Sequence, residues 1–374
     1  MALIIVLCVS NLKAQLNNSF FEDRYLIEPA DSNKLFLGLN VLGFNKNNEY
    51  FNDIADGFTL FGYQFSPYIS YRPLKNVRID AGAYFQKDFG NDGFTEIAPL
   101  FTLKVEFDHL SLVFGNLESS LNHRLIEPLY DFERVLNDRL ENGLQVLINR
   151  DNLFLDAWID WELMITKGDP NQEEVSGGLS LVYDLYKKNN LTIQLPFQFV
   201  AFHRGGQIDS NPGPLVTLTN FALGGTVKLK RPGNGFVKEV RFDNYYVYYR
   251  DFSSVLLQPF LDGNGLYFNV NILGKKGIEI MGSYWRGNEF ISFQGGQLYP
   301  SVSSTFKNPD AIEPTRELFI LRFMHNIKVA DNLYVSSRIE PYYDFRNEVV
   351  EFSHGLYINY RTDFYLWKNP GKRR

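Results

Sequence analysis

The sequence predicts a transmembrane antiparallel β-barrel, and three observations point to that fold class. Apolar and polar residues alternate with a period of two over long segments, for example from Leu153 to Ile165. Aromatic residues make up 16% of the chain although hydrophobic residues total only 45%, a balance that suits a sheet with one apolar and one polar face. Short and long connections alternate, as they do between the periplasmic turns and outer loops of outer-membrane barrels.

The alternating segments place about sixteen strands, with boundaries uncertain by roughly two to four residues. We expect them near 34–45, 58–72, 76–87, 94–107, 109–116, 139–149, 152–166, 174–186, 190–204, 215–230, 236–250, 264–274, 277–286, 315–329, 332–345 and 350–367. Tight polar turns such as Arg150-Asp151 form every second connection between consecutive strands. An even number of strands puts both termini in the periplasm. Four prolines, Pro67, Pro99, Pro196 and Pro341, fall inside these strands, and each indicates either a bulge or a strand boundary that is set wrongly.

Composition excludes other classes of protein. The chain has no run of 18 apolar residues that would cross a membrane as a helix. Its net charge of −6 disfavours nucleic acid as a partner. A soluble β-sandwich or propeller is the alternative fold, but neither has a reason to alternate short and long connections over so many strands.

The N-terminus has the pattern of an export signal. Ala2 to Val9 form a short apolar core, and cleavage is expected after Ala14, although no basic residue precedes the core. Cys8, the only cysteine, lies in this segment, so the mature chain would have neither a disulfide nor a catalytic thiol. The expected organisation is a signal peptide at 1–14, a periplasmic N-terminal segment at 15–33, the barrel at 34–367 and a basic periplasmic tail at 368–374.

The last strand carries the aromatic residues Tyr360, Phe364, Tyr365 and Trp367, an ending similar to the signal read by the barrel-insertion machinery. By pattern, length and export signal, the chain resembles bacterial outer-membrane porins of the sixteen-stranded type. The resemblance implies a channel for passive diffusion of small hydrophilic solutes in a Gram-negative outer membrane. It also implies that the protein contacts outer-membrane lipid and lipopolysaccharide and needs no cofactor. A homo-oligomer or a larger membrane complex is compatible with the resemblance. The alternative is a non-conducting barrel subunit of an outer-membrane assembly, or a secretion or polysaccharide-export channel.

Hairpin pairing predicts an acidic wall on the inner face. A turn at Arg150-Asp151 would put Glu141 opposite Asp160, and the next hairpin would put Asp184 opposite Asp156. The predicted wall consists of Glu141, Asp156, Asp160, Glu162 and Asp184, with Trp158 among them. A solvated pore wall, a loose site for a divalent cation at Glu141 and Asp160, and a sugar site against Trp158 remain alternatives, because carboxylate oxygens suit calcium or magnesium rather than zinc.

A basic wall is predicted half a turn around the barrel. It consists of Arg316, Arg322, Arg338 and Arg361, all expected to point inward. Opposed acidic and basic walls would set a transverse field across a pore and favour cations modestly at low salt. The alternative is that Glu340, Asp344 and Glu351 neutralise these arginines locally.

Two long connections stand out. The segment 117–138 is the third outer loop, which the porin resemblance makes the constriction loop, with Glu118, Arg124, Glu127, Asp131, Glu133 and Arg134 as its charges. A surface loop that binds divalent ions and lipopolysaccharide is the alternative. The connection 287–314 is rich in aromatics, which favours a loop that folds over its rim, plugs the mouth, packs on a neighbour or binds a ligand.

A lipase-type barrel enzyme would need a histidine and a serine together on the lipid face. His203, His325 and His354 are expected to point outward. The last hairpin would put Pro341 opposite His354 and leave Ser337 four residues away, out of hydrogen-bond reach. Histidine spacings typical of metal sites are also lacking, so the sequence predicts neither an enzyme nor a metal site.

Overall fold

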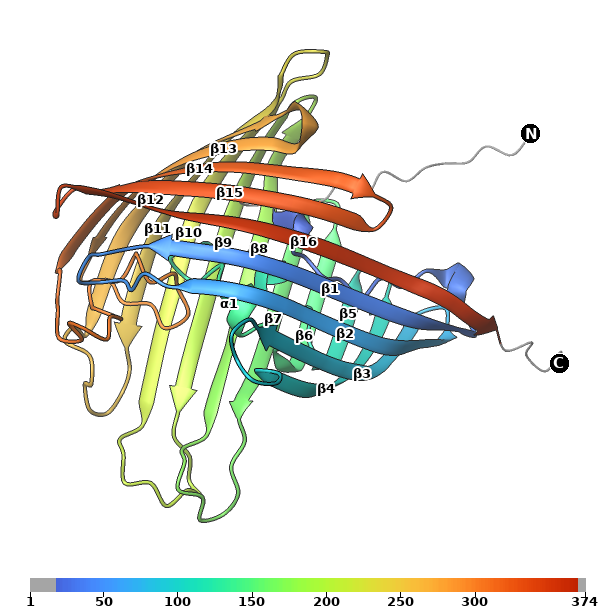
Figure 1. Ribbon diagram of the computed structural model, residues 1–374, viewed down its shortest axis with the longest axis horizontal. Coiled ribbons are helices and arrows are strands. Elements are labelled where there is room, and N and C mark those ends of the chain that lie inside the picture. Colours follow the sequence, from blue (N-terminus) through green and yellow to red (C-terminus); the bar gives the residue numbers. More distant parts are fainter. Residues whose placement is uncertain (1–17, 369–374) are drawn as a thin grey trace.

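The computed structural model describes residues 18–368, which form a closed barrel of antiparallel strands (Figure 1). Sixteen strands follow one another around the barrel in chain order, and β1 pairs with β16 to close it. The predicted fold class is confirmed. The signal peptide expected at 1–14 and residues 369–374 of the expected tail lie outside the described residues.

The strands are joined by short turns at the end of the barrel where both termini lie (Figure 1) and by longer loops at the other end. Their bounds are β1 Lys34–Glu49, β2 Thr59–Leu74, β3 Val77–Asp88, β4 Glu96–Phe107, β5 Leu110–Asn116, β6 Asn142–Arg150, β7 Leu153–Leu163, β8 Glu174–Lys188, β9 Leu191–Arg204, β10 Val216–Lys230, β11 Val237–Asp251, β12 Asp262–Gly274, β13 Ile278–Asn288, β14 Thr315–Ala330, β15 Leu333–Asp344 and β16 Val349–Lys368.

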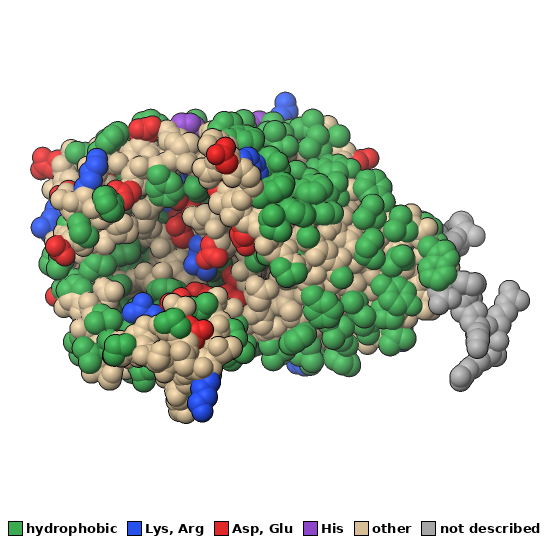
Figure 2. All heavy atoms as spheres, turned by 60° about the horizontal axis from the view of Figure 1, so that its bottom comes forward, with side chains coloured by type: hydrophobic (Ala, Val, Ile, Leu, Met, Phe, Trp, Pro, Cys, Tyr) green, Lys and Arg blue, Asp and Glu red, His purple; other side chains and the backbone are tan. Residues whose placement is uncertain are grey.

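The period of two decides which side chains face lipid. In β4, Thr102 and Lys104 are buried inside the barrel whereas Phe101 points outward and is exposed. Since the strand face alternates at every residue, apolar positions of the same parity form a continuous outer belt. Figure 2 shows hydrophobic side chains over the outer wall and charged ones gathered in a hollow at the loop end. The barrel is therefore an outer-membrane protein.

Helices are few and short. They are η1 Asn18–Phe20, η2 Pro29–Asp31, η3 Ser120–His123, α1 Arg134–Asn137 and η4 Lys275–Gly277. Among residues 18–368, no helix has the length and apolarity needed to cross a membrane.

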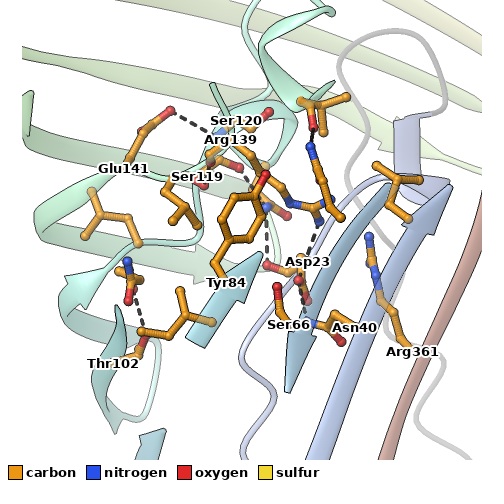
Figure 3. A pocket seen from close by; sticks show the side chains of 18 of the residues that line it. Asp23, Asn40, Ser66, Tyr84, Thr102, Ser119, Ser120, Arg139, Glu141 and Arg361 are labelled. Carbon is orange, nitrogen blue, oxygen red and sulfur yellow. Dashed lines mark hydrogen bonds and ion pairs between the residues drawn. The ribbon is translucent and has the colours of Figure 1, made fainter. Parts of the chain in front are cut away.

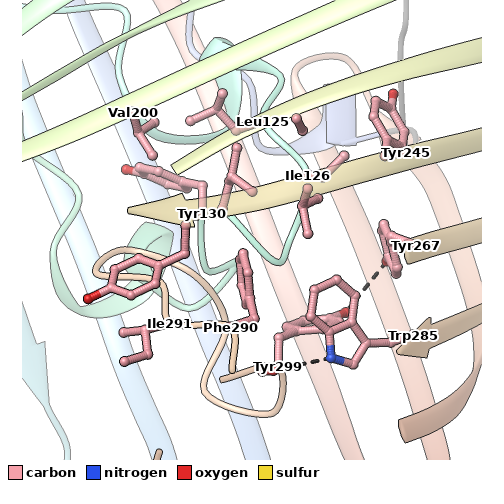
Figure 4. Packing of buried hydrophobic residues seen from close by; sticks show 14 of the residues in the cluster. Leu125, Ile126, Tyr130, Val200, Tyr245, Tyr267, Trp285, Phe290, Ile291 and Tyr299 are labelled. Carbon is pink, nitrogen blue, oxygen red and sulfur yellow. Dashed lines mark hydrogen bonds between the residues drawn. The ribbon is translucent and has the colours of Figure 1, made fainter. Parts of the chain in front are cut away.

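The interior of the barrel is filled by the two long loops. Leu125, Ile126 and Tyr130 of the loop between β5 and β6 pack with Phe290 and Tyr299 of the loop between β13 and β14 (Figure 4). The loops are also hydrogen-bonded to each other, because the Asp131 amide donates to the Gln294 carbonyl at 2.7 Å and the Gly296 amide to the Glu127 carbonyl at 2.8 Å. Of the alternatives for 287–314, the structure places this loop inside the mouth as a plug.

From Asn18 onward the N-terminal segment contacts the inside of the barrel, whereas a periplasmic segment was expected at 15–33; residues 15–17 lie outside the described residues. The Phe21 ring lies edge-on to Phe132 and to Tyr357, with both centroid distances 5.0 Å. The Tyr25 amide donates to the Glu118 carboxylate at 2.9 Å. The apolar rings of Phe20 and Phe21 favour burial over a solvated position. The segment therefore packs against the loop between β5 and β6.

Two predicted registers need correction. The turn between β6 and β7 lies at Asp151-Asn152, so Asp160 pairs with Gly143, and Glu141 precedes the strand instead of facing Asp160. Asp156 pairs with Ser180 in β8, so it does not face Asp184. A shift by an even number of residues keeps every side chain on its predicted face but moves its partners along the strand.

The third correction concerns the last hairpin. His354 pairs with Ile339, and Pro341 pairs with Phe352, a shift of two residues from the expected register. Ser337 pairs with Leu356 on one side and with His325 on the other, so an outward histidine does lie opposite a serine.

Candidate functional site

The inner face carries a histidine held between two carboxylates. His123 of η3 is completely buried, with Nε2 at 2.7 Å from Glu141 Oε2 and Nδ1 at 2.9 Å from Asp156 Oδ2. Its ring stacks on the indole of Trp158, with centroids 3.6 Å apart. Gly178 leaves room for that indole, because a Cβ there would lie 2.7 Å from the ring. The cluster fastens the loop between β5 and β6 to the barrel wall.

Electrostatics favour the charged forms of His123 and Glu141. Burial on its own would lower the pKa of His123, but the charges and hydrogen bonds of Glu141 and Asp156 outweigh it and raise the pKa to about 10. Burial would raise the pKa of Glu141, yet the His123 charge and the hydrogen bonds from His123 and Tyr130 lower it to about 2. Both imidazole nitrogens are occupied and the ring is closed off from solvent, so His123 has no route to a substrate.

The remaining members of the expected acidic wall do not form one surface. Asp160 accepts the Asn142 amide at 2.6 Å, Glu162 is exposed at the rim near Gln294, and Asp184 lies toward the other end beside Gln194 and Lys187. Glu141 uses its oxygens on His123, Tyr130 and the Ser120 amide. Both Glu141 oxygens are therefore already engaged, which argues against a divalent-cation site at Glu141 and Asp160.

The four arginines of the expected basic wall point inward, and loops or the N-terminal segment cover them. Arg316 pairs with Asp344 and Glu313, and Arg322 pairs with Glu127 and Glu340. Arg338 donates to Asn18 at 2.7 Å, and Arg361 donates to the carbonyls of Phe21 and Glu22. Carboxylates therefore neutralise Arg316 and Arg322 locally, which was the alternative to a bare basic wall.

The charges predicted on the constriction loop serve mainly as internal contacts. Glu118 accepts from Lys104 Nζ at 2.9 Å, Glu133 accepts from Asn48 at 2.7 Å, and Arg134 pairs with Asp138 at 2.7 Å. The guanidinium of Arg124 lies over the Phe154 ring at 3.7 Å. Burial and the charge of Glu133 raise the pKa of Asp131 to about 7. The loop lies inside the barrel, and its role in narrowing a solute path stays a prediction.

A polar cavity of about 60 Å³ remains between this loop and the N-terminal segment (Figure 3). Asp23, Asn40, Tyr84 and Arg139 point into it from different elements. A cavity of this size could hold a few ordered water molecules between the loop and the N-terminal segment.

The outer wall has a much larger hollow, an apolar groove of about 520 Å³ over β6 to β9. Three small outward residues, Ala157, Gly177 and Ala201, make its floor, and Leu144, Leu179 and Phe199 are among its walls. Gly177 and Ala201 are directly paired, and Ala157 pairs with Leu179, two residues along β8 from Gly177. A slot of this size and polarity accommodates hydrocarbon chains.

One end of this outer-wall groove is polar. His203 and Thr217 are paired across β9 and β10, and His203 Nδ1 lies 2.9 Å from Thr217 Oγ1. His203 is the second-last residue of β9 and Thr217 the second of β10, so the pair lies at the loop end of the barrel. Among residues 18–368, His203 Nε2 has no hydrogen-bond partner, and His203 is one of the residues that line the groove.

The other outward histidines differ from His203. His325 lies near the short turn after β14, and its Nε2 contacts the Lys276 carbonyl at 3.1 Å. His354 faces Ile339 and Asn47 and has no hydroxyl opposite. The sequence reasoning considered only serine near His354 and missed the His203–Thr217 pair. The intervening connection is too long to fix the register from turn chemistry, although the outward parity of both residues was visible.

Solved structures that are similar in fold include outer-membrane proteins. They include OprD from Pseudomonas aeruginosa, at 11% identity and TM-score 0.53 over 91% of this chain and 98% of that one. A loop-deletion variant of OmpT from Vibrio cholerae is 11% identical, with TM-score 0.52 over 88% of this chain and 99% of that one. OmpT in a trimer form is 9% identical, with TM-score 0.50 over 89% and 100%. At such identities the likeness concerns the fold alone.

Sequence comparison identifies a family. No curated protein matches the chain. The family model described as lipid A 3'-O-deacylase-type matches residues 27–369, which is most of the barrel. This match corrects the expectation that the chain is not an enzyme: the search for a hydroxyl was limited to one histidine, and the registers on which it relied were shifted. The chain belongs to the lipid A 3'-O-deacylase-type family.

Proposed function

We propose that the protein hydrolyses an O-linked acyl ester of lipid A in the outer leaflet, at the groove beside His203 and Thr217. The observation that carries the proposal is that a histidine–hydroxyl pair lies at the polar end of an acyl-sized slot on the lipid face. The family match supports the reaction class.

The depth of the pair suits an ester at the membrane interface. His203 and Thr217 lie at the loop ends of their strands, where the apolar belt gives way to the headgroup layer. Trp161 is exposed at the same level, since it pairs with Val175, which pairs with His203. Outward tryptophans mark membrane interfaces. An ester whose sugar lies in the headgroup layer would meet His203 there, and its acyl chain would extend down the groove.

Hydrolysis needs a base for water and a donor for the developing oxyanion. The mechanism uses the His203 tautomer in which Nδ1–H donates to Thr217 Oγ1, because Nε2 can then accept a proton from water. The water oxygen bonds to the ester carbonyl carbon, and the Thr217 hydroxyl, which still has its own proton to donate, is placed for the oxyanion. The bond from carbonyl carbon to sugar oxygen then breaks, and Nε2 returns its proton to that oxygen, which yields a fatty acid and a free sugar hydroxyl.

Passive diffusion of small hydrophilic solutes is the second candidate function. The sixteen-stranded architecture and the polar cavity beside Asp23 and Arg139 favour it. The two interlocked loops in the lumen oppose a wide path. Both functions are compatible with one barrel, because they use opposite faces of the same wall.

The deciding experiment compares two outward histidines in one barrel. Purified protein is incubated with lipopolysaccharide in proteoliposomes, and released fatty acid and shortened lipid A are measured by mass spectrometry. We expect His203→Gln to lower the rate at least 100-fold and His354→Gln to leave it unchanged. Acyl release that survives His203→Gln at the native rate contradicts the site, and absence of release by the native protein contradicts the reaction.

A further inference from the structure

The loop between β11 and β12 is apolar and exposed at the level of the His203–Thr217 pair. Residues 252–261 read Phe-Ser-Ser-Val-Leu-Leu-Gln-Pro-Phe-Leu and contain no charge. Val255, Leu256 and Leu257 are each about half exposed, at 53%, 48% and 53%. Connecting segments at a protein surface are usually polar, and three adjacent exposed aliphatic residues call for an apolar contact.

The loop is tied to Thr217 at its first residues. The Phe252 amide donates to the Thr217 carbonyl at 2.8 Å, and the Thr217 amide donates to Ser253 Oγ at 2.9 Å. The Ser253 amide in turn donates to Asp251 Oδ1 at 2.7 Å. The loop is therefore attached directly to the strand end that holds the hydroxyl.

The other end of the loop is anchored in the barrel. Phe260 packs against the luminal cluster that includes Phe290 and Trp285. With Ser253 held by Thr217 and Phe260 held inside, the aliphatic residues between them are the part left exposed. The aliphatic residues are thus exposed although both ends of the loop are held in place.

The exposed residues continue the lipid-facing belt. Phe242 and Tyr246 point outward from β11, Phe252 follows with the same parity, and it is 65% exposed. On this face Arg250 precedes Phe252 and pairs with Asp262 at 2.6 Å, so one ion pair separates the apolar belt on β11 from the loop. The apolar residues resume at Phe252, and hydrocarbon is the contact that suits both them and the belt. The absence of charge over ten residues removes the barrier to entry of the loop into the acyl layer.

We propose that residues 252–261 form a lip that dips into the outer leaflet and holds lipid acyl chains beside the His203–Thr217 pair. The catalytic part of this inference rests on the proposed function. The occupant is the acyl layer of the leaflet itself; a second copy of the chain or another protein on the same residues would contradict the proposal.

The position of the lip can be tested without any enzyme assay. A nitroxide is attached at Leu256→Cys, and its accessibility to oxygen and to a water-soluble nickel chelate is measured by electron paramagnetic resonance in proteoliposomes. The matched site is Phe306→Cys, which is 94% exposed on a part of the loop between β13 and β14 that also carries Lys307 and Asp310. Unsubstituted protein carried through the same labelling corrects for Cys8. We expect oxygen to dominate at Leu256 and nickel at Phe306. Equal nickel accessibility at both sites, or spin–spin broadening at Leu256 from a second copy, overturns the proposal.

The catalytic part uses the triple variant Val255→Ser, Leu256→Ser, Leu257→Ser, with Phe306→Ser as control. We expect acyl release from lipopolysaccharide in vesicles to fall at least 10-fold in the triple variant, with unchanged hydrolysis of a soluble short-chain ester. The control should match the native protein on both substrates. Native rates on vesicles by the triple variant contradict the lip. If the native protein hydrolyses neither substrate, the proposed function fails, while the nitroxide measurement still decides whether the loop enters the leaflet.

Discussion

The imidazole of His123 lies flat against the indole of Trp158, at 3.6 Å between centroids and 14° between planes. This contact joins a luminal loop to β7, whose outward residues Ala157 and Ile159 border the outer-wall groove. The plug inside the barrel and the groove outside it therefore share one piece of wall.

Removal of the His123 imidazole should destabilise the barrel. His123→Gln leaves Glu141 and Asp156 buried without their cation, a loss that typically costs about 3–5 kcal/mol. The free energy of unfolding, measured by urea titration in detergent, should fall by about that amount. His109→Gln, at an exposed turn, is the control and should leave stability unchanged. A loss below about 1 kcal/mol would mean that the buried triad does not hold the loop.

The stability that His123 contributes should depend on pH in a defined direction. Its pKa is raised from 6.5 to about 10, so the contribution is complete below pH 6.5 and is lost as pH rises through about 10. The pKa of Glu141 is lowered from 4.5 to about 2, so its contribution is complete above pH 4.5 and is lost as pH falls through about 2. The stability difference between native protein and His123→Gln should peak between pH 4.5 and 6.5. A difference that grows from pH 7 to 10 would contradict a protonated His123.

Filling the groove should block the lipid substrate without harm to the fold. Ala201→Leu places a larger side chain on the groove floor two residues below His203, while the side chain still faces lipid. We expect acyl release to fall at least 10-fold and the unfolding midpoint to stay constant. Ala81→Leu, on the outward face of β3, is the matched control. Equal acyl release by both variants would mean that the acyl chain lies elsewhere.

The interlocked loops predict a barrier to ions. Planar-bilayer recordings of the native protein should show low conductance, because Glu127, Arg322 and Tyr299 connect both loops and the wall across the lumen. Replacement of residues 289–313 by a short Gly-Ser linker should raise conductance several-fold. The same replacement at 206–213, an outer loop of mostly exposed residues, serves as control. High conductance of the native protein would favour the channel function.

Much of the barrel could be predicted from the chain alone. Alternation of apolar and polar residues in β4 and β7 settles which side chains face lipid, since this depends only on the period of a strand. Asp156, Asp160 and the four arginines point inward as their parity requires. The partners of these residues could not be predicted from the alternation. A turn at Asp151-Asn152 instead of Arg150-Asp151 moves each cross-strand partner by two residues, but every side chain stays on the same face of the sheet.

The sequence by itself determined the strand count, the closed barrel and the lipid-facing belt, because these follow from local periodicity and from the alternation of connection lengths. Only the tertiary structure decided what fills the lumen and what lies on the outer wall. His123 lies in η3, and its partners come from the residue before β6 and from β7. His203 meets Thr217 across a connection of eleven residues. Pairings across such distances depend on loop packing and strand register, and neither is recorded in a pattern with a period of two.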